Sequence, residues 1–141
     1  MIIPFTIQKI TAPNTALKFS LALRQHFEAD EIKKREYFKV LMLDFDMNVL
    51  GCIHAGTGNK NTCPVSFRSI AKGITDLEPR FLVLGHNHPS GKLFPSAKDI
   101  ILTEKIEKLA NLLDVCIMDH IILTATGFYS FVLDGKLKVG N

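Results

Sequence analysis

The stretch HNHPSGKLFPSAKD, which runs from His86 to Asp99, decides both the fold and the chemistry of this chain. Residues 81–85 before it read FLVLG and follow a Glu-Pro turn signal, so they predict a buried strand. His86 and His88 stand two residues apart at the end of that strand. Side chains two apart in an extended chain point to the same face, roughly 6.5–7 Å apart. Two imidazoles placed in this way can bind one metal ion.

The second half of the stretch predicts the start of a helix. Ser96 and Asp99 have the spacing of helix-capping residues, and apolar residues recur with helical periodicity after them. The helix dipole favours a carboxylate in the first turn. Two interpretations stay open from the residues alone. Ser96 and Asp99 form only a capping pair, or Asp99 adds a third ligand to the two histidines and leaves one coordination position free.

The complete spacing resembles the JAMM motif of the JAB/MPN metalloprotease superfamily: His-x-His, seven residues, serine, two residues, aspartate. The longer string, His-Asn-His-Pro-Ser-Gly followed by Pro-Ser-x-x-Asp, resembles the RadC branch. This resemblance covers roughly residues 12–134. It implies that His86, His88 and Asp99 bind Zn²⁺, and that the protein is a JAMM-type zinc metallopeptidase. The substrate that it implies is a peptide or protein, cleaved at an amide or isopeptide bond.

The resemblance also implies two catalytic residues. Residues 35–38 read REYF and are similar to the RadC segment in which Arg-Glu opens a core strand. The resemblance implies that Glu36 takes a proton from the zinc-bound water and delivers it to the leaving amine. Zinc lowers the pKa of that water to about 7. Without the resemblance, a salt bridge to nearby lysines is the default for Glu36. The Ser96 hydroxyl either donates to the developing oxyanion or only caps its helix.

The rest of the chain predicts alternating strands and helices. We expect helices over roughly 14–27, 65–74 and 96–113, and hairpin turns at 44–48 and 124–127. Strands are expected at 2–10, 37–43, 49–55, 81–85, 114–123, 128–133 and, briefly, after a turn at 134–135. This alternation predicts an α/β (mixed α+β) domain with a mixed sheet flanked by helices. The resemblance implies the cytidine-deaminase-like three-layer sandwich of a single JAB/MPN domain over 1–141.

Three features bear on substrate contacts and on the extent of the metal site. RadC-type sequences commonly carry His-Pro-Arg-Glu where residues 63–66 here read CPVS, so contacts near that segment are expected to differ. Asp119-His120 is similar to the family's Asp-His-Ile-Ile segment. For His120, a hydrogen-bonded structural role is favoured over a distal metal-site role. Leu93 and Phe94 form either a hydrophobic lip of the cleft or an inward-packing pair.

Composition limits the setting and the partners. The net charge of +3 is small, so nucleic-acid binding is expected to be weak or indirect at most. The three cysteines show no C-x-x-C pairing, which favours a reducing compartment, and no signal peptide or ~18-residue apolar run is evident. We therefore expect a cytoplasmic protein without membrane association. We also expect no helix-hairpin-helix region of the kind that many RadC proteins have, because little sequence precedes the first expected helix. The oligomeric state is left open.

Two other functions stand beside the zinc hydrolase. The first is a non-catalytic, metal-bearing interaction domain linked to DNA repair or mobile elements, which the naming of the family suggests. The second is a metal-dependent nuclease, because His-Asn-His also occurs in that class. The motif here follows one strand and precedes a loop and a helix. It therefore lacks the ββα-metal context that such a nuclease requires.

Overall fold

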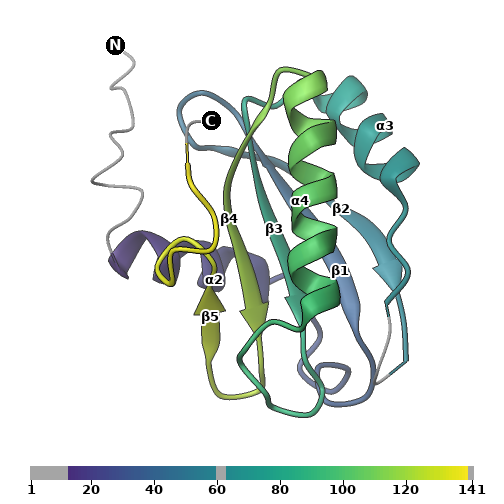
Figure 1. Ribbon diagram of the computed structural model, residues 1–141, viewed down its shortest axis with the longest axis vertical. Helices are drawn as coiled ribbons and strands as arrows, with labels where there is room; N and C mark the ends of the chain where they lie inside the picture. Colours follow the sequence, from purple (N-terminus) through teal and green to yellow (C-terminus); the bar gives the residue numbers. More distant parts are fainter. Residues whose placement is uncertain (1–12, 60–62, 140–141) are drawn as a thin grey trace.

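The computed structural model describes residues 13–59 and 63–139, which form one mixed sheet with helices on both faces (Figure 1). The strands, in chain order, are β1 (Tyr37–Leu43), β2 (Val49–Thr57), β3 (Phe81–Asn87), β4 (Cys116–Leu123) and β5 (Phe128–Ser130). The helices are α2 (Pro13–Arg24), α3 (Phe67–Leu77) and α4 (Ala97–Leu112). The strand expected at 2–10 lies outside the described residues. No helix among the described residues has the length and apolar character needed to cross a membrane.

The topology of the sheet brings distant segments to one rim. The strand order is β2-β1-β3-β4-β5; β3 and β4 run parallel, and the other neighbouring pairs run antiparallel. Phe38 at the start of β1 lies opposite His86 near the end of β3. The N-terminal end of β1 and the C-terminal end of β3 therefore meet, which is the arrangement that the role implied for Glu36 requires.

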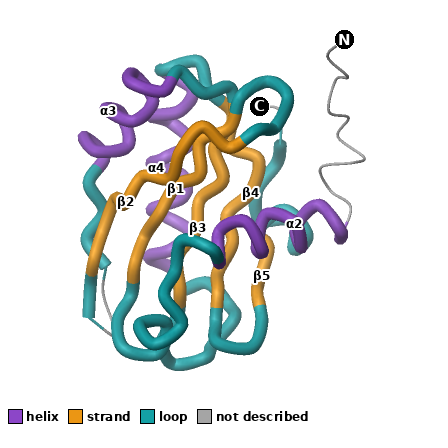
Figure 2. Tube along the Cα trace, turned by 180° about the vertical axis from the view of Figure 1, so that it is seen from behind, coloured by secondary structure: helices purple, strands orange, loops and turns teal. Residues whose placement is uncertain are grey.

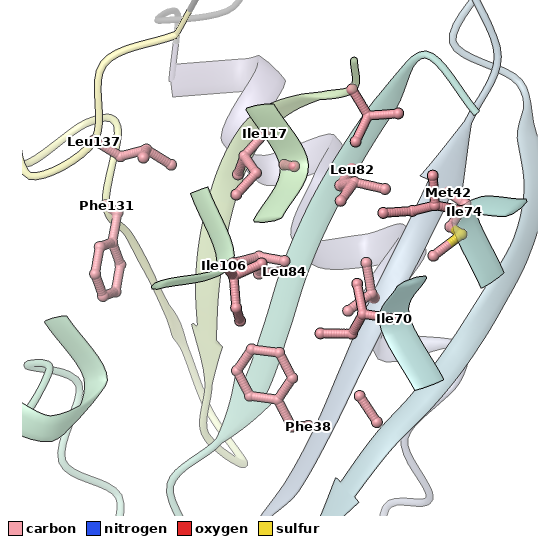
Figure 3. Close-up of a cluster of buried hydrophobic side chains, with 14 of the residues drawn as sticks. Phe38, Met42, Ile70, Ile74, Leu82, Leu84, Ile106, Ile117, Phe131 and Leu137 are labelled. Atoms are coloured by element: carbon pink, nitrogen blue, oxygen red, sulfur yellow. The ribbon is translucent and has the colours of Figure 1, made fainter. Parts of the chain in front are cut away.

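Both faces of the sheet are covered. Helices α3 and α4 lie on one face (Figure 1), and α2 crosses the other (Figure 2). The cluster between the sheet and α3 and α4 includes Met42, Leu84 and Ile106 (Figure 3). Leu23 of α2 packs on the opposite side against Leu41 and other strand residues. The sequence of a strand that is buried on both faces is a nearly continuous run of apolar residues. The predicted fold class, a mixed sheet between helical layers, is confirmed.

The predicted turn between β1 and β2 is present, and helix α2 ends slightly earlier than predicted. Asp44 Oδ1 accepts hydrogen bonds from the backbone N–H groups of Asp46 and Asn48, 2.9 Å each, which closes the expected β1–β2 turn. Helix α2 ends at Arg24 rather than near residue 27. The chain leaves the helix there in a tighter turn, in which the His26 N–H donates to the Leu23 carbonyl at 2.9 Å.

The C-terminal part differs from the prediction. Strand β5 ends at Ser130 instead of continuing to 133, and no further strand follows it among the described residues. The buried carboxylate of Asp119 accepts hydrogen bonds from the Ser130 hydroxyl and from the Val132 N–H at 3.1 Å, so the chain is turned back. The Lys136 N–H donates to the Phe131 carbonyl at 2.8 Å. Phe131 and Val132 stay buried in this turn, and their apolar pattern alone resembles that of a strand.

Candidate metal centre

Three metal-ligand side chains converge at the rim where β3 ends and α4 begins. His86 lies in β3, His88 just after it, and Asp99 in the first turn of α4. The Nε2 atoms of the two histidines are 3.0 Å apart. Asp99 Oδ1 lies 3.4 Å from His86 Nε2, and Asp99 Oδ2 lies 3.2 Å from His88 Nε2. Ligand atoms 2.0–2.1 Å from a tetrahedral zinc ion stand about 3.3–3.4 Å apart, so this donor set fits such an ion.

The capping pair and the ligand turn out to be the same residues. Asp99 Oδ2 accepts a hydrogen bond from the Ser96 N–H at 2.9 Å, and the Asp99 N–H donates to Ser96 Oγ at 3.1 Å. This capping box fixes the carboxylate while leaving it in contact with both histidines. The Ser96 hydroxyl accepts in this box and keeps its own proton for another acceptor. For Asp99, helix capping is therefore compatible with metal binding. For Ser96, helix capping is compatible with donation to an oxyanion.

Charge in the cluster suits cation binding. Burial alone raises the pKa of Asp99, but the contacts with the imidazoles of His86 and His88 outweigh it and hold the pKa well below its usual value. Burial lowers the pKa of His86. Burial also acts to lower the pKa of His88, but the hydrogen bond to Asp99 and the neighbouring negative charge raise it overall. An ionised carboxylate beside two imidazoles is a donor set that suits a divalent cation, because a ligand must be deprotonated at the atom that binds the metal.

The second nitrogen of each histidine is also engaged. His88 Nδ1 lies 2.7 Å from the Lys92 carbonyl oxygen, which can only accept, so Nδ1 carries the proton. His86 Nδ1 lies 2.7 Å from Nε2 of His120 on β4. The structure thus confirms a hydrogen-bonded role for His120, outside the three-ligand group. Burial lowers the pKa of His120 well below its usual value.

Glu36 lies at the same rim. It precedes β1 by one residue, and the register that places Phe38 opposite His86 places Glu36 opposite His88 when continued by two residues. Glu36 and His88 both line the cavity described below. Burial raises the pKa of Glu36; the charge of His88 opposes that shift, and Asp99 adds to it. These contributions reflect the proximity of Glu36 to the cluster.

Asn87, the middle residue of His-Asn-His, holds the backbone around Glu36. Its Oδ1 accepts from the Tyr37 N–H at 2.8 Å, and its Nδ2 donates to the Arg35 carbonyl at 2.9 Å. The Gly58 N–H donates to the Glu36 carbonyl at 2.8 Å. These contacts of Asn87 were not predicted from the sequence. The one signal for them was that Asn87 is polar and that strand alternation directs its side chain away from His86 and His88.

A cavity of about 690 Å³ opens over the cluster. Besides the five predicted site residues, its lining includes Phe38, Cys63, Pro64, Ser90, Lys92, Phe94, Pro95, Lys98 and Leu102. Phe94 is 75% exposed, and its ring meets that of Tyr129 edge to face with centroids 6.0 Å apart. Phe94 therefore forms a hydrophobic lip of the cavity, which is one of the two arrangements expected from the sequence. The segment that departs from the RadC pattern, at Cys63 and Pro64, contributes to the wall of the cavity.

The layered fold and this His-x-His and Asp cluster define a domain of the JAB/MPN type. Residues 10–136 match the family described as RadC-like JAB domain. The chain belongs to that family, as its motif predicts.

Its relatives include UPF0758 proteins from several bacteria. One from Haemophilus influenzae (strain PittEE) is 36% identical over 122 residues, which cover 86% of this chain and 52% of the relative. UPF0758 protein YkfG of Escherichia coli (strain K12) is 35% identical over 115 residues, or 82% of this chain and 71% of the relative. The chain spans about half the length of the first of these relatives.

Proposed function

We propose that this domain is a zinc-dependent hydrolase of peptide or isopeptide bonds. The observation that carries the proposal is the convergence of His86, His88 and the ionised Asp99 in a cavity that also contains Glu36. A bound zinc ion would supply a water molecule of lowered pKa and polarise the substrate carbonyl. Two imidazoles, one carboxylate and a free position are a ligand set typical of catalytic zinc.

The residues of the chain have separable roles in this reaction. The Glu36 carboxylate accepts the proton of the attacking water and returns it to the leaving amine. Partial burial suits this exchange, because it brings the pKa of Glu36 closer to neutrality. The Ser96 hydroxyl donates its free proton toward the developing oxyanion. Phe94 and Leu102 offer apolar surface to a side chain of the substrate beside the cleaved bond.

The test compares the zinc-loaded protein with Glu36→Gln on libraries of peptides, isopeptide-linked peptides and nucleic acids. The amide is nearly isosteric but cannot carry the proton, so the variant should keep zinc and lose ~10²–10⁴-fold of the hydrolysis. Glu31→Gln is the matched control, because Glu31 accepts a hydrogen bond from the Tyr37 hydroxyl outside the cavity.

Three results would contradict the proposal in different ways. Equal cleavage by Glu36→Gln and the control would remove the role of Glu36. Cleavage of nucleic acid alone would favour the nuclease. Zinc binding without cleavage of any library would favour the non-catalytic, metal-bearing interaction domain.

A further inference from the structure

A chain of buried hydrogen bonds leads away from the metal cluster through the core. His86 Nδ1 lies 2.7 Å from His120 Nε2, and His120 Nδ1 lies 2.7 Å from Thr103 Oγ1. The Thr103 hydroxyl lies 2.8 Å from the backbone carbonyl oxygen of Asp99. This series of hydrogen bonds therefore starts at the side chain of His86, one proposed ligand, and ends on the backbone of Asp99, another. It connects β3, β4 and α4.

The position of each proton in this series of hydrogen bonds follows from the bond at the Asp99 carbonyl. The Asp99 carbonyl can only accept, and two oxygen atoms 2.8 Å apart repel without a proton between them, so the Thr103 hydroxyl donates there. The Thr103 oxygen is then an acceptor, and His120 Nδ1 must carry a proton. A neutral imidazole carries one proton, so His120 Nε2 accepts and His86 Nδ1 donates. The lone pair of His86 Nε2 is left facing His88 and Asp99.

The surroundings of His120 keep its ring neutral. The ring has 0% exposure, stacks on Phe131 with centroids 4.4 Å apart, and meets Phe38 edge to face at 5.5 Å. Both phenylalanines belong to the apolar cluster beneath α4 (Figure 3). The two ring nitrogens of His120 bond to an imidazole and a hydroxyl, so neither bonds to a carboxylate that could pair with a charge. A buried, unpaired charge is strongly disfavoured.

We infer that His120 and Thr103 are positioning residues that lock His86 in the tautomer whose Nε2 can bind the metal ion. A histidine ligand usually donates its second ring N–H to a carboxylate, a carbonyl or a water molecule. His88 follows that rule with the Lys92 carbonyl. His86 instead uses a second histidine, whose own tautomer is set by a threonine. The two ligands are thus oriented by separate contacts, and one can be perturbed without the other.

This inference rests on the metal-binding part of the proposed function, but its first test needs no metal. Long-range ¹⁵N–¹H spectra show which nitrogen of each imidazole carries a proton. In the chain after zinc removal, both His86 and His120 should appear as Nδ1–H tautomers. A proton on His86 Nε2, or protons on both nitrogens of His120 at neutral pH, would overturn the inference whether or not the protein binds zinc.

The second test measures zinc affinity by competition with a chelator. His120→Leu removes the acceptor and should weaken zinc binding ~10–100-fold, the usual effect of losing a partner of a metal ligand. His120→Gln should restore most of the affinity, because its amide oxygen can accept from His86. Thr103→Val keeps every ligand and both histidines, and it should shift the His86 tautomer and weaken binding.

Thr124→Val is the matched control, because Thr124 is a buried threonine whose hydroxyl bonds to Gly127 and not to His86, His120 or Asp99. It should leave affinity and tautomers unchanged. Wild-type affinity in His120→Leu, or equal affinities in Thr103→Val and Thr124→Val, would overturn the inference. If His120→Leu fails to fold, Thr103→Val and the spectra of the unaltered chain still decide. Absence of zinc binding in the unaltered chain would instead refute the proposed metal centre.

Discussion

Replacing Gly85 by alanine tests how closely α2 must approach the strand that carries the histidines. A Cβ atom at this position would lie 2.6 Å from Leu23 Cδ2 and 2.8 Å from Leu23 Cδ1. Leu23 has 0% exposure, so its side chain cannot swing out into solvent and has to shift within the core. Overpacking of this kind costs about 1–3 kcal/mol. For a domain of this size, that loss lowers the melting temperature by roughly 3–10 °C.

A double-mutant cycle identifies the cause of the loss. Leu23→Ala alone leaves a cavity and should cost about 2–5 kcal/mol of unfolding free energy. In the double variant, the methyl group added at position 85 enters the vacated space, so the combined cost should fall at least ~1 kcal/mol below the sum. Urea unfolding of the four proteins, followed by circular dichroism, measures these free energies.

Gly127→Ala provides the control. A Cβ atom there would lie 3.7 Å from Leu93 Cδ1, an ordinary van der Waals contact, so stability should change by no more than ~0.5 kcal/mol. The reasoning is refuted if Gly85→Ala is as stable as this control. It is also refuted if the costs of Gly85→Ala and Leu23→Ala add within ~0.5 kcal/mol.

Four further substitutions, at three positions, test other contacts by equilibrium unfolding of the zinc-free chain. Burial raises the pKa of Asp119 from 3.8 to about 6, so its contribution to stability is present below pH ~4 and lost as the pH rises through about 6. Relative to Asp119→Asn, the wild type should lose on the order of 3 kcal/mol over that interval, and parallel pH profiles would contradict this. Asn87→Leu should cost several kcal/mol, at about 1–3 for each backbone group left without a partner, and near-neutrality would show that water replaces the amide. Ser96→Ala should cost ~1 kcal/mol and Ser96→Gly only a few tenths, whereas equal losses would argue against the cap.

The sequence was most informative where one local pattern determines the structure. The apolar runs before His86 and after Glu36 predict the two central strands, because strands buried on both faces have few alternatives. The spacing of Ser96 and Asp99 predicts the start of α4, and the capping box confirms it. The role that the resemblance implies for Glu36 requires the start of β1 and the end of β3 at one rim, and the antiparallel pairing of the two strands places them there.

Contacts between distant residues could not be predicted in the same way. His120 lies 34 residues beyond His86, and their hydrogen bond depends on the parallel register of β3 and β4, which local spacing does not specify. The C-terminal turn was missed for a related reason. Its shape depends on the Asp119 carboxylate, which binds the backbone of Val132 from a neighbouring strand, while the apolar pattern of the segment favours a strand.

Metal analysis of purified variants tests the central claim most directly. The unaltered chain should contain about one zinc ion per protein molecule, held by His86, His88 and Asp99. His88→Ala and Asp99→Ala should each lose most of it. His54→Ala should keep it, because His54 contacts Thr57 and Tyr37 away from the cavity. Undiminished zinc in both His88→Ala and Asp99→Ala would contradict the account.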